Sequence, residues 1–225
     1  AHIIWCGNKK WDSEFPEKPL PENAVKMERD ANIFTGSLIY GVVPFLICLL
    51  IIYIKWHWLG TKTVYPALVP VGILIGLILM PVHELLHAVC YCKGQTVYIG
   101  ISLEKLAAFA VCHEKISRRR FVVMSLMPIL LGIIPLAVFL IGPSSPILSA
   151  ICIPTGIIGM LSPMPDYMDV HMVHKQVPKG AYIQSQNDGF IGSDKFQFFG
   201  LHHPGFTPGQ TSSMKRCRGF FFSCS

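Results

Sequence analysis

Residues 121–165 read FVVMSLMPILLGIIPLAVFLIGPSSPILSAICIPTGIIGMLSPMP and contain no charged residue. The run is about twice as long as the ~20 residues that a helix needs to cross a hydrocarbon core. Glycine, proline and serine gather at 142–146, where the chain would have to reverse its direction. The run therefore predicts two membrane-spanning helices, at 121–141 and 146–164.

Two other uncharged stretches, Phe34–Ile54 and Thr63–Val82, each match one further span. We place these spans at 34–55 and 64–89. The composition agrees, because 52% of the chain is hydrophobic and only 14% is charged, whereas a soluble domain carries about 25% charged residues. The same numbers exclude a disordered chain. We expect an all-α polytopic membrane protein with about four transmembrane helices, whose partner is the lipid bilayer and which has no nucleic-acid partner.

Basic residues near the span ends predict the orientation of the protein. The connection between the first two spans has only Lys55 and Lys62. The opposite ends are richer in positive charge: Lys26, Arg29, Lys93, Lys105, Lys115, Arg118, Arg119 and Arg120. We therefore expect a multi-pass protein of the cell membrane with its N-terminus, the 91–120 loop and the C-terminal tail in the cytoplasm.

This orientation divides the chain into three parts. Residues 1–33 form a cytoplasmic N-terminal segment, residues 34–175 form the transmembrane domain, and residues 176–225 form a cytoplasmic tail. From about residue 191 the tail shows no helical or strand period, and we expect it to be flexible.

The second span ends in MPVHELLHA, residues 80–88. Residues four apart share one face of a helix, so His83 and His87 can bind the same zinc ion. Glu84 lies beside the first histidine and can act as general base toward the attacking water. Ionisable groups at membrane depth are expensive and usually functional. The alternative is a pair of interfacial histidines with Glu84 as a capping charge. It would explain a single polar residue at this position well, but it explains three together poorly.

A catalytic zinc ion takes three protein ligands and keeps a fourth position for water. The fourth span returns to the membrane face at which the second one ends, and Asp166 follows the uncharged run directly. Asp169 shares the helical face of Asp166. We favour Asp166 as the third Zn²⁺ ligand because Pro165 suits a helix start, and Asp169 is the alternative. Asp166 could instead be a helix-capping acid.

Four other ionisable residues near these positions have simpler interpretations. His171 and His174 continue toward Lys175 and indicate a solvated helix face. His113 and Glu114 stand beside Lys115 and indicate a loop surface.

Two short apolar runs interrupt the polar 91–120 loop. Thr96–Ile101 is β-branched and aromatic and predicts a strand, and Ala107–Val111 predicts a strand or a helix. We expect a small cytoplasmic hairpin between the second and third spans. Such a hairpin beside the zinc ion can hold an extended substrate by edge pairing.

These motifs resemble a known family. The order of an apolar helix, Pro-x-His-Glu-Leu-Leu-His-Ala at 81–88, a short loop, two more spans and Pro-Asp-Tyr-Met-Asp at 165–169 is similar to bacterial membrane proteins grouped as zincin peptidases of unknown function. These proteins are similar in plan to site-2 proteases, which are intramembrane zinc enzymes. The resemblance covers about residues 35–190.

The resemblance implies His83 and His87 as paired ligands, Glu84 as the base and Asp166 as the later ligand. One feature departs from it, since site-2 proteases usually present that aspartate before glycine and here Tyr167 follows.

The sequence thus predicts a zinc metalloprotease that cleaves membrane-embedded or membrane-adjacent peptide or protein substrates at the cytoplasmic edge of the bilayer. The rival is a non-enzymatic metal-binding membrane scaffold or assembly factor, in which Asp169 or Cys90 fills the position that water needs. A small transporter is less favoured, because the chain has no internal repeat and its polar residues gather at one membrane face.

Overall fold

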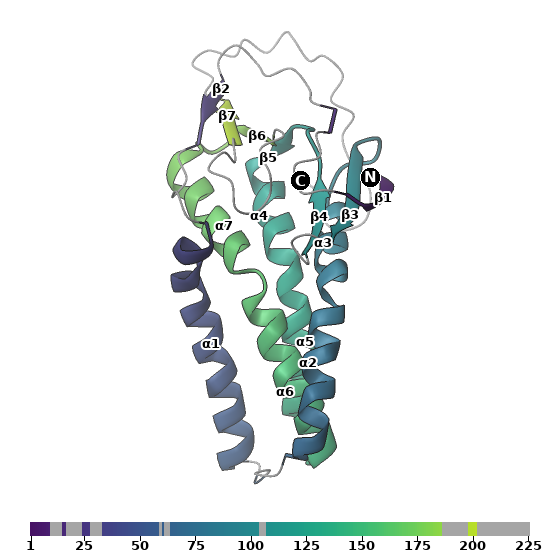
Figure 1. Ribbon diagram of the computed structural model, residues 1–225. Helices are drawn as coiled ribbons and strands as arrows, with labels where there is room; N and C mark the ends of the chain where they lie inside the picture. The colour runs from purple at the N-terminus through teal and green to yellow at the C-terminus, as the bar shows by residue number, and fades with distance from the viewer. Residues whose placement is uncertain are drawn as a thin grey trace.

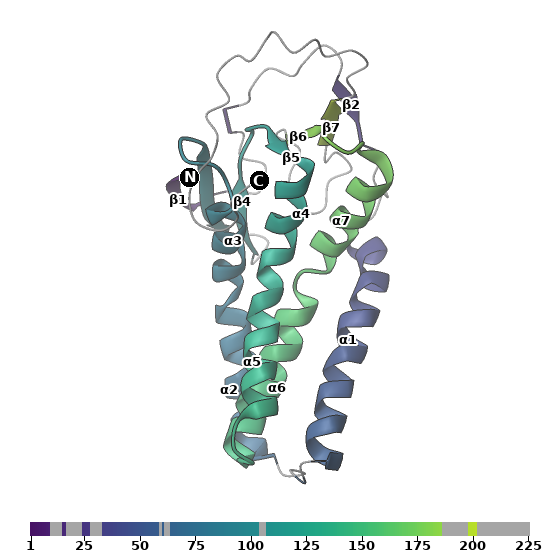
Figure 2. The same ribbon diagram turned by 180° about the vertical axis from the view of Figure 1, so that it is seen from behind.

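The computed structural model of the chain describes residues 1–9, 15–16, 24–27, 33–58, 60, 64–103, 107–185 and 198–201, and the structural statements below concern these residues. Long helices run side by side through the molecule, and the strands gather at one end of the helical bundle (Figure 1). The view from behind shows the same two layers (Figure 2). The chain is mostly helical, as expected, and adds two small sheets that an all-α fold does not include.

Four helical segments are long and apolar enough to cross a membrane: Thr35–His57, Pro66–Val89, Arg118–Ile141 and Pro146–Gln176. They correspond to the four predicted spans. The fourth differs in length, because it continues to Gln176 rather than ending near residue 164. The extension is a separate helix whose first turn carries Asp166.

The spans are built from helices with short interruptions. The first span is α1 (Ile33–Trp58), and the second consists of α2 (Val69–Ile78) and α3 (Met80–Val89). The third consists of α4 (Arg118–Leu126), a 3₁₀ turn at Met127–Ile129 and α5 (Leu130–Ile141). The fourth consists of α6 (Pro146–Leu161) and α7 (Met164–Gln176).

Glycines allow the helices to pack closely around α6 and α7. A methyl group added at Gly132 of α5 would overlap Met160 of α6, and one at Gly72 of α2 would overlap the Ile151 carbonyl of α6. At Gly41, α1 meets the side chain of Met164 at the start of α7. These three contacts bring α5, α2 and α1 against the fourth span with no room for a larger side chain.

A buried lysine closes the end of the bundle that lies away from the strands. The Lys55 ammonium of α1 donates hydrogen bonds to the carbonyls of Leu140, at 3.1 Å, and Gly142, at 2.7 Å. These carbonyls belong to the end of α5, where a positive charge is favourable. Lys55 therefore fastens α1 to the turn between α5 and α6.

The first sheet has the strand order β1-β3-β4. Its centre is β3 (Thr96–Ser102), which pairs with β4 (Ala107–Val111) in antiparallel fashion and with β1 (His2–Asn8) in parallel fashion. The sheet therefore has two outer edges, one on β1 and one on β4. The sequence did not indicate β1.

This sheet is packed on both faces. One face buries Val97, Ile99, Ala110 and Cys112 against Ala88 of α3. On the other face, Phe15 lies 5.1 Å from the ring of Tyr98 and 5.7 Å from that of Phe109, measured between ring centroids. The N-terminal segment and α3 therefore enclose the hairpin from opposite sides.

The second sheet has the order β2-β7-β6-β5 and is antiparallel throughout. Its strands are β5 (Ile116–Ser117), β6 (Tyr182–Ser185), β7 (Phe198–Leu201) and β2 (Ala24–Lys26). Strands β6 and β7 come from the predicted tail. The remaining tail, residues 186–197 and 202–225, lies outside the described residues.

Candidate metal centre

Helix α3 presents His83 and His87 on one face. Both side chains are buried, and their Nε2 atoms lie 3.1 Å apart. The rings meet edge to face, with centroids 4.8 Å apart. The spacing of four residues therefore places both imidazoles on one helix face, as predicted, and both face a common point.

Asp166 reaches that point from α7. Its Oδ2 lies 3.2 Å from Nε2 of His83 and its Oδ1 lies 3.4 Å from Nε2 of His87. The break between α6 and α7 makes this possible, since it falls at Ser162 and Pro163 and starts a new helix whose first turn carries the aspartate. The three residues form one buried group, with ligand atoms all within 4.8 Å of one another.

A carbonyl of α4 fixes the tautomer of His87. The Nδ1 of this ring lies 3.0 Å from the Met124 carbonyl, and a carbonyl only accepts, so Nδ1 carries the proton. The carbonyl accepts from the N–H of Met127 but lacks the usual donor four positions on, because Pro128 has no N–H, and it can therefore accept a second bond from His87. A neutral His87 therefore turns an unprotonated Nε2 toward Asp166.

A hydroxyl at the helix break does the same for His83. The Ser162 hydroxyl donates to the Gly159 carbonyl at 3.4 Å, replacing the N–H that Pro163 lacks. The Ser162 oxygen lies 3.3 Å from Nδ1 of His83. Because its O–H already donates to Gly159, it accepts the hydrogen bond from the Nδ1–H of His83. His83 also turns a lone pair on Nε2 inward.

The centre thus gathers two imidazole nitrogens and two carboxylate oxygens that all carry lone pairs. Such atoms repel one another at 3.1–3.4 Å unless a cation or a shared proton lies between them. Two neutral imidazoles and one carboxylate are the donor set of a catalytic zinc site. A hydrogen bond on the outer nitrogen of each ligating histidine is the usual arrangement around such a metal. The residues present therefore fit a zinc ion.

Tyr167 stabilises the helix break. Its hydroxyl donates to the Met160 carbonyl at 3.0 Å, near the end of α6. The residue that follows Asp166 therefore ties the first turn of α7 to the last turn of α6. From the sequence, Tyr167 was only a departure from the site-2 protease pattern. Its role could not be predicted, because its contact with the Met160 carbonyl depends on how α6 and α7 pack.

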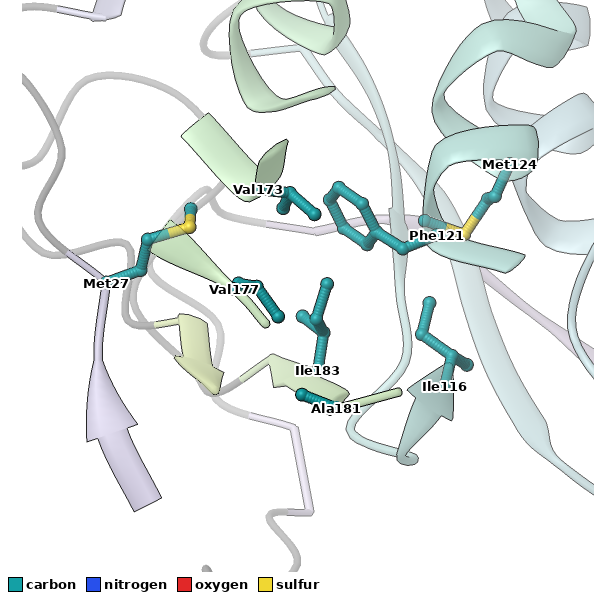
Figure 3. Packing of buried hydrophobic residues seen from close by; sticks show 8 residues of the cluster. All are labelled: Met27, Ile116, Phe121, Met124, Val173, Val177, Ala181 and Ile183. Carbon is teal, nitrogen blue, oxygen red and sulfur yellow. The ribbon is translucent and has the colours of Figure 1, made fainter. Parts of the chain in front are cut away.

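An apolar cluster holds α4 in place above the centre. In Figure 3 the ring of Phe121 lies next to Val173 of α7, with Ile183 of β6 beneath it and Met124 on the adjoining turn of α4. The cluster joins α4, α7 and the second sheet, and its buried members are Met27, Ile116, Phe121, Met124, Val173, Val177, Ala181 and Ile183. It thereby positions the Met124 carbonyl that holds His87.

Glu84 lies next to the centre, on the side of the first sheet. The backbone N–H of Ala110 in β4 donates to its carboxylate. Its Oε2 is buried and has no hydrogen-bond partner among the described residues. One carboxylate oxygen of Glu84 is therefore left for a water molecule or a substrate.

The other candidates do not belong to the group of ligand atoms. Asp169 is buried on α7 but is not a member of the group, and neither is Cys90. His171 and His174 are exposed, as predicted. His113 is buried and its Nδ1 donates to the Pro16 carbonyl at 3.0 Å, so its interpretation as loop surface was wrong.

A pocket leads to the centre from the side of the sheets. His87 and Asp166 line it, and so do Tyr91, Ala110 and Ser185. Burial raises the pKa of the Tyr91 phenol, so this hydroxyl stays protonated at neutral pH and can donate a hydrogen bond within the pocket.

Two histidines four apart on a helix, with a glutamate next to the first and a third ligand from a later helix, are typical of a zincin-type metal site. The comparison with protein families agrees: residues 76–182 match the model of a family described as "Putative zincin peptidase". This match confirms the resemblance seen in the motifs, and it includes His83, Glu84, His87 and Asp166. No curated protein and no solved structure gives a significant match to the chain.

The first prediction concerns metal content. Purified wild-type protein should hold about one zinc ion per chain, since one group of three ligands is present. His83→Ala and Asp166→Ala should lose it, and the matched variant Asp169→Ala should keep it. Mass spectrometry of the folded, detergent-purified proteins measures the content. Zinc that is lost with Asp169 and retained without Asp166 would contradict the assignment.

The second prediction concerns Ser162. Ser162→Ala leaves His83 without the acceptor for its Nδ1 proton, and zinc affinity should fall about 10- to 100-fold, as it does when such outer partners are removed. Competition with a zinc chelator measures the affinity. Ser149→Ala is the control, because the Ser149 hydroxyl of α6 also donates to a backbone carbonyl, that of Ser145 at 3.1 Å, but lies away from the centre. Equal affinities of the two variants would refute the role of Ser162.

Proposed function

We propose that the protein is a zinc-dependent membrane metalloprotease that hydrolyses peptide bonds at the cytoplasmic edge of the bilayer. The observation that carries the proposal is the convergence of His83, His87 and Asp166, with a carboxylate oxygen of Glu84 left without a partner beside them. The family match over residues 76–182 supports the same activity.

His83, His87 and Asp166 hold the metal in this proposal. A zinc ion bound there would polarise the peptide carbonyl. It would also lower the pKa of water, so that a nucleophile forms at neutral pH. The protein's own contribution is orientation: the Met124 carbonyl and the Ser162 hydroxyl keep both imidazoles aimed inward. The site therefore does not need to reorganise during the reaction.

Glu84 moves the proton. Its carboxylate takes a proton from the attacking water while the water oxygen bonds to the carbonyl carbon. The same group then gives the proton to the nitrogen of the scissile bond as the C–N bond breaks, which yields a carboxylate and an amine. The Ala110 N–H binds one side of the carboxylate and so orients the side chain for both transfers.

The free edge of β4 is suited to hold the substrate. Ile101 of β3 faces β1, because its carbonyl accepts from Lys9, so its partner Ala108 on β4 faces outward. Ala110, two residues on, also faces outward and reaches Glu84. An extended peptide paired with this edge lies beside the general base. Strand β4 rather than β3 therefore provides the pairing edge in the hairpin that the sequence predicts.

The arrangement of the strands supports the proposed orientation in the cell membrane. Strand β1 pairs with β3, so the N-terminal segment and the 91–120 loop lie at the same end of the bundle. Strand β6 pairs with β5, which brings the beginning of the tail to that end as well. The excess of Lys and Arg in these segments favours the cytoplasm.

The rival function is a non-enzymatic scaffold with a closed four-ligand metal site. Among the described residues, the metal-binding group has only three members, and neither Asp169 nor Cys90 belongs to it. Three protein ligands with a fourth position open are typical of catalytic rather than structural zinc. The geometry therefore favours the enzyme.

The third prediction separates the two functions. Glu84→Gln keeps the shape of the side chain but cannot take up a proton, so cleavage should fall about 10²- to 10⁴-fold while zinc content stays at the wild-type value. Both are measured on protein in lipid vesicles. Wild type stripped by a chelator is the control and should lose metal and cleavage together, then regain both with zinc. A Glu84→Gln protein that cleaves normally would exclude this mechanism.

The fourth prediction concerns the edge of β4. Ala108→Pro removes one outward N–H, and KM for a peptide substrate should rise about three- to tenfold, the equivalent of one backbone hydrogen bond. Zinc content should not change. Ile3→Pro is the matched control. Its neighbours in β1 bond to β3, so the backbone N–H of Ile3 points outward from the opposite edge of the same sheet. If both proline variants raise KM equally, β4 does not bind the substrate.

A further inference from the structure

We propose that the substrate reaches the centre from the aqueous side, as an extended segment lying outside the hydrocarbon, and that transmembrane segments do not enter from the lipid between the helices. The inference rests on the proposed peptidase function and specifies its substrate class. Three independent features of the described residues carry it: the walls of the pocket, the depth of the first sheet and the closure of the helix contacts.

The pocket that reaches the metal ligands is walled by the strand layer. Ala110 comes from β4, and Ile116, Ile183 and Ser185 come from the second sheet. The helices that contribute are α3, with His87 near its end, α4, and the first half of α7. Among the described residues, no lining residue belongs to α1, α2, α5 or α6, which form most of the surface that faces lipid. The approach to His87 and Asp166 therefore lies between the two sheets.

The first sheet carries polar groups as deep as Glu84. Strand β3 runs antiparallel to α3. Ala88, near the end of the helix, packs on Val97. Glu84, one turn earlier, contacts Ala110, which pairs with Ile99. Ile101 follows in the same direction and accepts from the backbone N–H of Lys9 at 3.0 Å.

Lys9 is exposed and so is its neighbour Asn8. An exposed lysine in the hydrocarbon is strongly unfavourable, so water or lipid headgroups must reach this depth along the sheet. Glu84 lies on the same side of α3 as the sheet. Water therefore has access at the depth of the general base, on the side where β4 has its free edge.

Three helices of the bundle pack tightly against the fourth span. Gly132, Gly72 and Gly41 bring α5, α2 and α1 against the fourth span so tightly that an added methyl group would overlap it. A transmembrane helix is about 10 Å wide with its side chains. Entry of such a helix between the fourth span and one of these three helices would require that contact to separate along much of its length, whereas an extended strand needs no such separation.

The substrate class follows from these features. It is an unfolded peptide segment adjacent to the membrane or a water-exposed loop or tail of a membrane protein, bound in extended form along β4. A peptide bond inside a folded membrane helix does not qualify, because its N–H and carbonyl groups already bond within the helix and cannot pair with a strand.

The position of cleavage tests the inference directly. The probe is a reporter protein with one Leu/Ala helix of about 20 residues, enough to span the bilayer, followed by an unstructured segment that contains every residue type. Wild type and Glu84→Gln are reconstituted with the probe in vesicles, and mass spectrometry locates the cuts. We expect every wild-type cut in the unstructured segment and none with Glu84→Gln. Cuts within the Leu/Ala helix would overturn the inference and leave the peptidase function standing.

A second measurement does not depend on activity. Lys9→Cys, Ser185→Cys and the control Ile134→Cys, at an exposed apolar position of α5, are treated in vesicles with a membrane-impermeant charged maleimide. Peptide mapping reads the modification at the introduced position only. We expect Ile134→Cys to react at least about tenfold more slowly than Lys9→Cys and Ser185→Cys, because hydrocarbon excludes the charged reagent. Reaction at Lys9→Cys and Ser185→Cys as slow as at Ile134→Cys would overturn the inference, even if the probe is not cleaved and the peptidase function fails.

Discussion

The two hydrogen bonds on the outer nitrogens of His83 and His87 determine what the centre can do. Because the Met124 carbonyl and the Ser162 hydroxyl accept hydrogen bonds from both Nδ1–H groups, both neutral imidazoles turn the lone pairs of their Nε2 atoms toward Asp166. Each acceptor exists because a proline interrupts a helix, Pro128 after α4 and Pro163 after α6. Broken helices at membrane depth are tolerated where protein covers the freed groups. Here the freed groups form the support of the metal ligands.

The convergence of His83, His87 and Asp166 could be predicted from the sequence because it depends on local rules. The helical period puts His83 and His87 on one face, and the length of the uncharged run returns Asp166 to the same membrane edge. The supporting groups follow no such rule. Nothing near Met124 indicates that its carbonyl meets a histidine 37 positions earlier, because that contact depends on how α3 and α4 pack. The same is true of β1, whose parallel partner β3 lies more than 90 residues away.

Tyr167 shows how the chain departs from the site-2 protease pattern without losing the geometry. A glycine after the aspartate would let the backbone turn freely. Tyr167 instead bonds to the Met160 carbonyl across the break between α6 and α7. The backbone path is then held by a side chain, and Asp166 arrives beside both imidazoles. The identity of the residue after the aspartate therefore matters less than whether the break is held in one conformation.

Charge balance explains why the centre lies at a helix break close to the strands rather than in the middle of the bundle. Two neutral imidazoles, the Asp166 carboxylate, the nearby Glu84 carboxylate and one divalent cation sum to zero, so the complete group can be buried with little electrostatic penalty. Without the cation, two carboxylates remain close together in a region of low dielectric constant, which is unfavourable. Metal binding should therefore contribute to the stability of the folded protein. Proximity to water along the first sheet would allow an ion to enter after the chain has folded and would supply the water that the proposed hydrolysis consumes.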